Sequence, residues 1–173
     1  MVWTHTHRVS YLIGSLLEGT LKLNIDGSFL EDFGCLGVGV GVHNHDGDWI
    51  TSFSHYEVGG DAFLAYLRAI QIDLDFCSKN GYVNIICESD CLEAVDLIIV
   101  DRDHTLHAYA TDILHIRDDL HGNENTTLMH VLMEQNMCAD FMANKRLHAR
   151  CSVNGNCPSS GMESLILRDK LRT

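Results

Sequence analysis

The stretch that decides the fold of this chain is residues 21–28, with the sequence LKLNIDGS. Apolar and polar residues alternate from Leu21 to Asp26, which is typical of a strand with one buried face. Gly27 and Ser28 are turn-forming residues and are expected to end this strand. The pattern therefore predicts an acidic side chain, Asp26, at the end of the first strand.

Two more strands follow and are expected to pair with the first one. Residues 36–42, LGVGVGV, alternate glycine with valine, so one face of this strand has almost no side chains and another layer can approach it closely. Asp46 and Gly47 form the dipeptide that is typical of a tight hairpin, and residues 49–54 follow as the next strand. These segments predict an antiparallel meander of three strands.

The rest of the chain alternates helices with strands. Asp61 is suited to cap an amphipathic helix that runs to Cys77 with apolar residues at three- and four-residue spacing. A β-branched run from Tyr82 to Cys87 indicates a strand that is buried on both faces. The remaining expected elements are a helix capped by Glu88, Ser89 and Asp90 that runs to about Ile99, a helix at 107–120, a strand at 126–133 and a helix at 137–148.

This order of elements predicts an α/β fold. Right-handed crossovers would continue the antiparallel meander as parallel strands, which gives a mixed five-stranded sheet flanked by helices. We expect the domain to span residues 21–150, between an N-terminal extension at 1–20 and a C-terminal tail at 151–173. A chain of 173 residues with 46% hydrophobic residues can bury one core of this kind.

The composition of the chain indicates where the protein is located and which partners it can bind. We find no membrane segment and no signal peptide, so we expect an intracellular monomer, in the nucleus or the cytoplasm. Five of the seven cysteines lie within or beside apolar segments without a tight pair and are interpreted as reduced, mostly buried thiols: Cys35, Cys77, Cys87, Cys91 and Cys138. The spacing of Cys151 and Cys157 is a poor match to a zinc site. The net charge of −12 opposes broad binding of polyanions, so any nucleic-acid contact is expected to be weak, local and metal-assisted.

Three aspartates occupy positions from which they can meet. Asp26 ends the first strand, Asp90 follows the fourth strand, and Asp140 lies near the start of the last helix. Carboxylates that converge repel one another unless cations hold them together, and oxygen ligands of this kind select Mg²⁺ or Mn²⁺. A single aspartate at a strand end is more often only a cap or a turn residue, so the pattern alone leaves both interpretations open.

Three motifs favour the interpretation of these aspartates as a metal-binding cluster. They are residues 23–28 (LNIDGS), residues 87–90 (CESD), and His130-Val131 followed by residues 134–143 (EQNMCADFMA). Together with the glycine-rich strand and Trp49 after the hairpin, they resemble the plant reverse-transcriptase-like branch of ribonuclease H, which occurs in retroelement-derived reading frames. The resemblance implies a ribonuclease H-like fold and metal-dependent, endonucleolytic hydrolysis of the RNA strand of RNA–DNA hybrids. It assigns Asp26, Asp90 and Asp140 as catalytic, metal-binding residues, with Mg²⁺ or Mn²⁺ in a two-metal site.

One position departs from the motif of the family. The family carries Ala-Glu-Leu early in the first long helix, whereas this chain has Ala62-Phe63-Leu64, so Phe63 replaces one catalytic carboxylate. Asp61 cannot substitute within a regular helix, because a separation of two residues rotates the side chain by about 200°. The resemblance therefore implies a strongly impaired nuclease, and the alternative is a catalytically inactive binding or interaction module, or a decaying retroelement fragment.

The basic residues and histidines give only two further candidates for a binding site. Lys145 and Arg146 lie on the last helix after Asp140 and are candidates for contact with nucleic-acid phosphates, although cations at a helix end also compensate the helix dipole. His43, His45 and His55 lie in or near the hairpin, and we expect them to face solvent.

Overall fold

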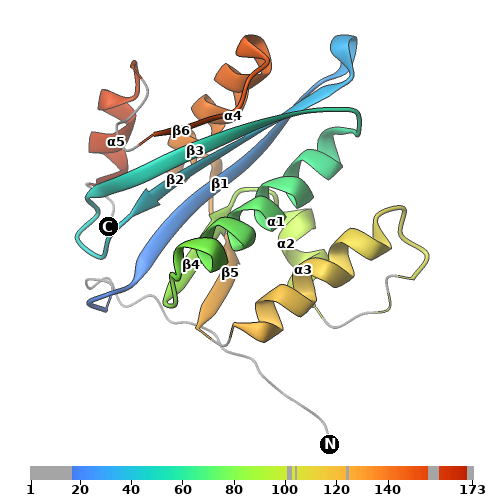
Figure 1. Cartoon of the computed structure of the whole chain (residues 1–173), viewed down its shortest axis with the longest axis horizontal. Coiled ribbons are helices and arrows are strands. Elements are labelled where there is room, and N and C mark those ends of the chain that lie inside the picture. Colours follow the sequence, from blue (N-terminus) through green and yellow to red (C-terminus); the bar gives the residue numbers. More distant parts are fainter. Residues whose placement is uncertain (1–16, 101–102, 104, 124, 156–159, 171–173) are drawn as a thin grey trace, which may run out of the picture.

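The sheet forms the centre of the molecule, and its strands lie in the order β5-β4-β1-β2-β3-β6 (Figure 1). The computed structural model describes residues 17–100, 103, 105–123, 125–155 and 160–170. Strand β1 pairs antiparallel with β2, and β2 pairs antiparallel with β3, whereas β4 and β5 continue parallel to β1. The predicted mixed sheet of five strands is confirmed, and β6 adds a short sixth strand antiparallel to β3. The strands are β1 (Leu21–Leu30), β2 (Cys35–His43), β3 (Trp49–Val58), β4 (Ile85–Ser89), β5 (Thr126–His130) and β6 (Val153–Gly155).

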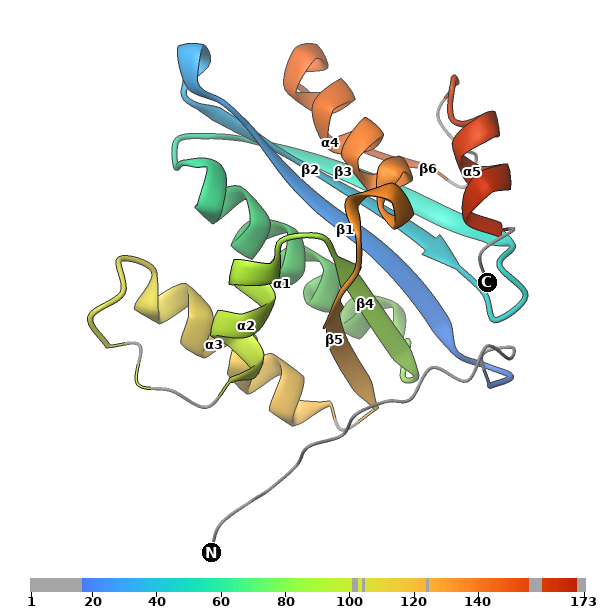
Figure 2. The same cartoon turned by 180° about the vertical axis from the view of Figure 1, so that it is seen from behind.

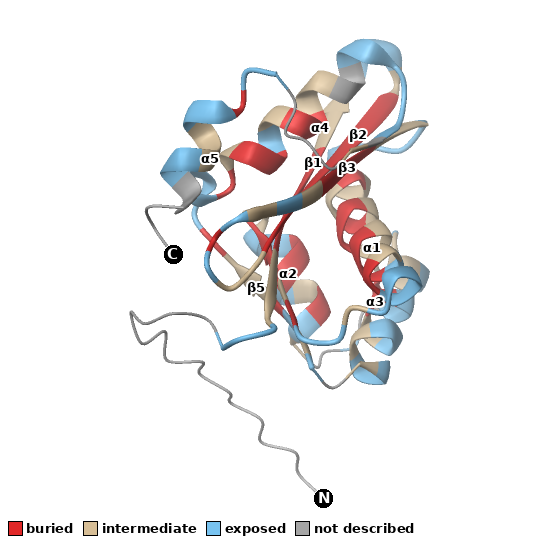
Figure 3. Ribbon diagram, turned by 60° about the vertical axis from the view of Figure 1, so that its left-hand side comes forward, coloured by how far each residue is buried: buried red, intermediate tan, exposed pale blue. Residues whose placement is uncertain are grey.

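Helices cover both faces of this sheet (Figures 1 and 2). Helix α1 crosses one face, and α2 and α3 lie on the same side; α4 packs on the opposite face, beside α5. Buried residues line β1, β2 and the sheet-facing sides of α1 and α4 (Figure 3). The helices are α1 (Ala62–Asn80), α2 (Leu92–Ile99), α3 (Ala110–Gly122), α4 (Met137–Ala149) and α5 (Glu163–Lys170), with short 3₁₀ turns η1 (Glu31–Phe33) and η2 (Met133–Gln135).

Two glycines let the helices lie close to the sheet. A Cβ atom on Gly39 of β2 would lie 2.3 Å from the carbonyl oxygen of Ala139 in α4. A Cβ atom on Gly27 of β1 would lie 2.3 Å from the carbonyl oxygen of Ala65 in α1. Real side chains do not approach backbone so closely, so glycine is required at both positions. The prediction that another layer lies against the glycine face of residues 36–42 is confirmed by α4.

Several predicted boundaries are wrong. The strand expected at 82–87 is β4, Ile85–Ser89, and the strand expected at 126–133 ends at His130. Two further errors lie beside Asp26 and Asp90. Gly27 and Ser28 do not end the first strand, because β1 continues to Leu30 in an antiparallel ladder with β2. Glu88 and Ser89 do not cap a helix, because they pair with Asn24 and Ile25 as the last residues of β4. The backbone ladder across the sheet has overridden the local turn and cap signals in both places. By contrast, Asp61 caps α1 as predicted, and its side chain accepts a hydrogen bond of 2.8 Å from the backbone N–H of Leu64.

His43 also differs from its prediction. Its side chain is buried, not exposed, and its ring meets the Trp49 ring edge to face with centroids 5.1 Å apart. Burial lowers the pKa of His43 to about 4. A polar residue beside a turn has thus become part of the core, because the hairpin folds Trp49 back over it.

The segment after α4 contributes two of the described elements. Strand β6 extends the β3 edge, and Met162 is buried against Cys138 and Met142 of α4, where α5 begins. Cys157 and the N-terminal residues 1–16 lie outside the described residues. Among the helices that the structure describes, none is long and apolar enough to cross a membrane.

Candidate functional site

The parallel pairing of β1 with β4 brings two of the three predicted aspartates side by side. The register pairs Ile25 with Ser89, and the next residue along each strand is Asp26 and Asp90. Strand β4 ends at Ser89, whereas β1 continues to Leu30, so the β4 side of β1 has no strand partner beyond Ile25. The two carboxylates therefore lie at the point where the sheet opens.

The electrostatics of Asp26 place the third aspartate at the same point. Asp26 is only 4% exposed, and its pKa is raised to about 8 by burial and by the negative charges of Asp90 and Asp140. Burial also raises the pKa of Asp90, while a hydrogen bond from the Asn136 side chain opposes that rise. Three carboxylates that are far apart in sequence thus act on one another, as the sequence predicted.

Asp140 is held from α4 by a chain of polar side chains. Nδ2 of Asn144 donates a hydrogen bond of 2.6 Å to Oδ1 of Asp140, and Oγ of Ser28 donates one of 2.8 Å to Oδ1 of Asn144. Asp140 itself is exposed. The chain joins the first turns of α4 to β1 two residues beyond Asp26, and so fixes the exposed carboxylate beside the buried one.

Asn136 is the position that sequence reasoning missed. It lies just before α4, is fully buried, and its Nδ2 donates a hydrogen bond of 2.8 Å to the carbonyl oxygen of Ile25. A signal was present, because Asn136 directly precedes the helix that carries Asp140. Its partner lies on a strand 111 residues away in sequence, however, which no local pattern reveals.

Glu88 does not take the place of the missing carboxylate. Its Oε2 accepts a hydrogen bond of 2.9 Å from Nδ2 of Asn24 and lies 3.7 Å from Nζ of Lys22. Asn24 and Glu88 pair in the β1–β4 ladder two residues before Asp26 and Asp90. Glu88 therefore serves as a buried structural partner, and the acidic set at the open end of the sheet consists of the three aspartates.

The fit of a divalent cation depends on Asp26 and Asp90. Within the described part of the chain, no group of three or more acidic, histidine or cysteine side chains is spaced to surround one metal ion. Mg²⁺, however, keeps several waters and commonly takes one or two protein carboxylates beside substrate phosphates. Oδ1 of Asp90 is buried without a hydrogen-bond partner, which leaves a lone pair for such a ligand. The donor set fits one cation, held by two carboxylates, with Asp140 beside it.

Phe63 lies in the first turn of α1, where the resemblance described above implies a glutamate. Its ring contacts His107, with centroids 5.4 Å apart, and Tyr109, with centroids 6.2 Å apart. Asp61 is committed elsewhere, because it caps α1 and also accepts a hydrogen bond of 2.7 Å from the Tyr109 hydroxyl. The expectation that Asp61 does not replace the missing carboxylate agrees with these contacts.

Of the two basic candidates, Lys145 lies against the C-terminal segment. Its Nζ donates a hydrogen bond of 3.3 Å to the carbonyl oxygen of Ser160 and lies 5.4 Å from the centre of the Phe141 ring. The side chain of Arg146 lies outside the described side chains. A nucleic-acid role for these two residues stays a prediction.

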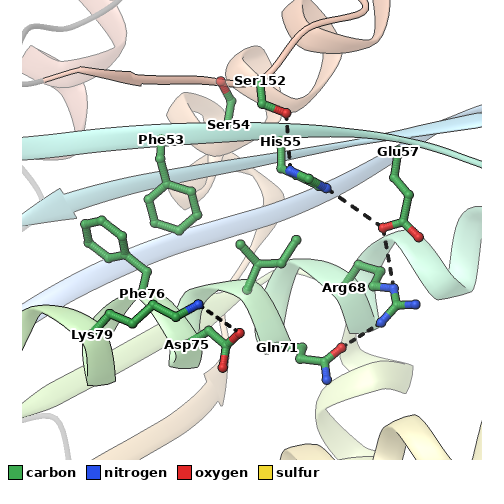
Figure 4. Close-up of a pocket in the computed structure, with 11 residues that line it drawn as sticks. Phe53, Ser54, His55, Glu57, Arg68, Gln71, Asp75, Phe76, Lys79 and Ser152 are labelled. Atoms are coloured by element: carbon green, nitrogen blue, oxygen red, sulfur yellow. Dashed lines mark hydrogen bonds and ion pairs between the residues drawn. The ribbon is translucent and has the colours of Figure 1, made fainter.

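A pocket of about 610 Å³ lies elsewhere, between α1 and β3 (Figure 4). The side chains at one end satisfy one another: Glu57 lies 3.6 Å from Nε of Arg68, and Ser152 lies 3.2 Å from Nδ1 of His55. Phe53 and Phe76 close the other end with ring centroids 4.4 Å apart. None of the three aspartates lines this pocket, so we do not place the candidate site there.

Comparison with known proteins identifies a family for this domain. A family model for reverse transcriptase-like domains matches residues 24–146. No curated protein matches the sequence.

Solved structures of ribonucleases H share the fold. RNase H1 of the halophilic archaeon Halobacterium salinarum NRC-1 is 19% identical with a TM-score of 0.69, and the match covers 75% of this chain and 98% of that chain. LC11-RNase H1, isolated from compost by a metagenomic approach and solved in complex with an RNA/DNA hybrid, is 17% identical with a TM-score of 0.65, over 75% and 98%. The foamy viral protease-reverse transcriptase in complex with dsDNA is 12% identical with a TM-score of 0.56, over 73% and 91%. This chain belongs to the reverse transcriptase-like family, and its domain has the ribonuclease H-like fold.

Proposed function

We propose that this domain binds nucleic acid through a divalent cation, Mg²⁺ or Mn²⁺, which Asp26 and Asp90 hold with Asp140 beside them, and that it hydrolyses the RNA strand of RNA–DNA hybrids slowly. The observation that carries the proposal is the convergence of the three aspartates at the open end of the β1–β4 pair, where burial, and then repulsion by Asp90 and Asp140, raises the pKa of Asp26. Such repulsion costs folding free energy, and a cation would relieve it. Structural neighbours solved with an RNA/DNA hybrid and with dsDNA support nucleic acid as the partner.

Each residue has a distinct part in this proposal. Asp26 and Asp90 would hold the cation, which, when bound, polarises the scissile phosphate and lowers the pKa of a water molecule. Asn136 orients Asp90 from the start of α4, and Asn144 orients Asp140. The net charge of −12 leaves the cation as the main attraction for phosphate, so binding is weak and depends on the ion.

The absence of a carboxylate at position 63, where the chain has Phe63, determines the rate of hydrolysis that we expect. A carboxylate about 4 Å from a cation in a partly shielded site contributes roughly 4 kcal/mol, which corresponds to about a thousandfold in rate if it acts fully in the transition state. The phenyl ring of Phe63 supplies no oxygen ligand, so a second metal position lacks its carboxylate. We therefore propose one functional cation and slow hydrolysis in place of the two-metal site that the resemblance implies.

The experiment that tests this proposal restores the carboxylate. Phe63→Glu is compared with Phe63→Gln, which has nearly the same shape but no charge, on a labelled RNA–DNA hybrid with Mg²⁺ and with Mn²⁺. We expect Phe63→Glu to cleave at least a hundredfold faster than the natural sequence, and Phe63→Gln to show no gain. Adding Asp26→Asn to Phe63→Glu should abolish the gain. If Phe63→Glu gains nothing over Phe63→Gln and the natural sequence leaves the hybrid intact even with Mn²⁺, the hydrolase assignment is wrong.

A second candidate function is a binding module without hydrolysis. The packing of Phe63 with His107 and Tyr109 favours it, because the replaced position has been absorbed into an aromatic cluster. Cation-dependent binding of nucleic acid without cleavage, even by excess protein with Mn²⁺, would favour this candidate.

A further inference from the structure

Phe63 belongs to an aromatic cluster built from two separate segments. Phe63 comes from the first turn of α1, whereas His107 and Tyr109 come from the segment that leads into α3. The Phe63 and Tyr109 rings lie 29° from parallel, and the centroids of His107 and Tyr109 are 6.1 Å apart. We call Phe63, His107 and Tyr109 the aromatic platform.

The platform is fixed by polar contacts, packs on one side against the hydrophobic core, and is partly open to solvent. The Tyr109 hydroxyl donates a hydrogen bond of 2.7 Å to Asp61, and the Tyr109 N–H donates one of 3.1 Å to Nδ1 of His107. All three rings are partly exposed, and Leu106, beside His107, is fully exposed. The rings are thus held in place before any ligand arrives, so little conformational entropy is lost when one stacks on them.

Helix α1 connects the platform to the carboxylates. Tyr66 follows Phe63 by three residues and so lies on the same side of the helix, about one turn further along. At this turn α1 crosses β1, since a Cβ atom on Gly27 would lie 2.6 Å from the backbone nitrogen of Tyr66. Gly27 directly follows Asp26. Burial raises the pKa of the Tyr66 hydroxyl, and the negative charges of Asp26 and Asp90 raise it further. The line of side chains therefore runs from the carboxylates through Tyr66 to the platform.

We propose that the aromatic platform binds an unpaired nucleobase, and that this domain takes single-stranded nucleic acid in preference to a blunt RNA–DNA duplex. This rests on the proposed function, because the cation at Asp26 and Asp90 would hold a phosphate of the same strand. Ring faces of bases are exposed in a single strand and hidden in a duplex, and stacking on aromatic side chains gives binding that tolerates any sequence. Stacking also needs no cationic surface, which suits a chain whose net charge is −12.

The test measures binding of the full chain to a fluorescently labelled RNA oligonucleotide, either single-stranded or annealed to its DNA complement as a blunt hybrid, in low salt with Ca²⁺ or Mg²⁺. Phe63→Leu removes the ring and keeps an apolar side chain, and Phe63→Trp keeps a ring. Phe33→Leu is the matched control, because Phe33 is an exposed phenylalanine on η1 and lies outside the platform. Circular dichroism and thermal melting confirm that each variant is folded.

We expect the natural sequence to bind the single strand about tenfold more tightly than the hybrid. Phe63→Leu should lose about tenfold in single-strand affinity, which is within the range for removal of one base–aromatic stack, while Phe63→Trp and Phe33→Leu should retain it. If the chain binds the hybrid at least as tightly as the single strand and Phe63→Leu changes neither affinity, the platform is only internal packing and the inference is wrong, while the proposed function stands. If neither nucleic acid binds with either cation, both proposals are wrong.

Discussion

Nδ2 of Asn136 donates a hydrogen bond of 2.8 Å to the carbonyl oxygen of Ile25, and this bond attaches the start of α4 to β1 one residue before Asp26. The same side chain stabilises the ionised form of Asp90. One buried amide thus bonds β1 beside Asp26, acts on Asp90 just after β4, and lies directly before the helix that carries Asp140. The relative positions of all three aspartates depend on it.

Asn136→Ala should therefore lower the stability of the fold and also disturb the relative positions of the three aspartates. The substitution leaves the Ile25 carbonyl buried without its partner, which costs about 1–3 kcal/mol. Urea unfolding measures this free energy. Asn80→Ala is the matched control, because Asn80 also bonds a backbone carbonyl, that of Phe76, but is exposed. We expect the control to lose about 0.5 kcal/mol at most. Equal losses in the two variants would contradict the role assigned to Asn136.

Cation affinity should depend on pH through Asp26. Because the pKa of Asp26 is about 8 without a cation, this carboxyl group is largely protonated at pH 7, and a cation must displace the proton. Displacement of one proton predicts that the apparent Kd for Mn²⁺ falls about tenfold per pH unit below pH 8 and levels off above it. Calorimetric titration between pH 6 and 9 measures this slope. Asp26→Asn should abolish it, whereas Asp75→Asn, which changes an exposed carboxylate of α1, should not alter it.

Asp73 gives a prediction for stability against pH. This residue of α1 is completely buried: Cys87 donates a hydrogen bond of 3.0 Å from Sγ to its Oδ2, and its Oδ1 has no partner. Burial raises its pKa from 3.8 to about 7. The folded state thus holds a proton that the unfolded state loses near pH 4, so stability falls as pH rises from about 4 to about 7 and then levels off.

Asp73→Asn isolates this effect from the similar one of Asp26. The amide cannot ionise, so the variant should gain stability relative to the natural sequence as pH rises through this window, by up to roughly 4 kcal/mol. Urea unfolding of both proteins at pH 5, 6, 7 and 8 gives the difference at each pH. A difference that stays constant across the four values would show that Asp73 does not titrate in the folded protein.

The sequence predicts the sheet and the three aspartates well because both follow from local patterns. The alternation in β1 and the valine–glycine alternation in β2 define which faces are buried, and residues at the ends of parallel strands must meet at one edge of the sheet. Asn136, Asn144 and the burial of His43 were not predicted, because each depends on a partner that packing supplies. Asn144 bonds Ser28 across 116 residues, and His43 is covered by Trp49 only after the hairpin closes.

The strand boundary wrongly predicted at Gly27 also shows that a local sequence pattern cannot reveal tertiary packing. Glycine followed by serine is a turn signal, but here glycine serves the close approach of α1 to β1, and β2 supplies hydrogen-bond partners up to Leu30. Local propensity favours glycine at position 27 because glycine forms turns, whereas packing requires glycine there because α1 lies so close to β1. In the folded chain only the packing reason applies, because there is no turn at Gly27.

Gly39→Ala tests how tightly α4 is seated over the site. The new Cβ atom would lie 2.3 Å from the carbonyl oxygen of Ala139 and 2.5 Å from the nitrogen of Ala143, so the helix backbone must move outward. We expect a loss of about 3 kcal/mol, at the upper end of overpacking effects, since backbone cannot rotate away as a side chain can. Gly122→Ala is the matched control, because nothing lies within 4 Å of its Cβ position at the end of α3. That variant should be neutral or slightly stabilised.

The outward movement of α4 should also change the affinity of the site for Mn²⁺. Asp140 follows Ala139 directly, so a shift that relieves the clash carries this carboxylate away from Asp26 and Asp90 and lessens their mutual repulsion. Mn²⁺ titration of Gly39→Ala should then show weaker binding than the natural sequence at pH 7, while Gly122→Ala binds normally. Unchanged Mn²⁺ affinity in a destabilised Gly39→Ala would mean that the cation depends on Asp26 and Asp90 alone, and that Asp140 takes no part in holding it.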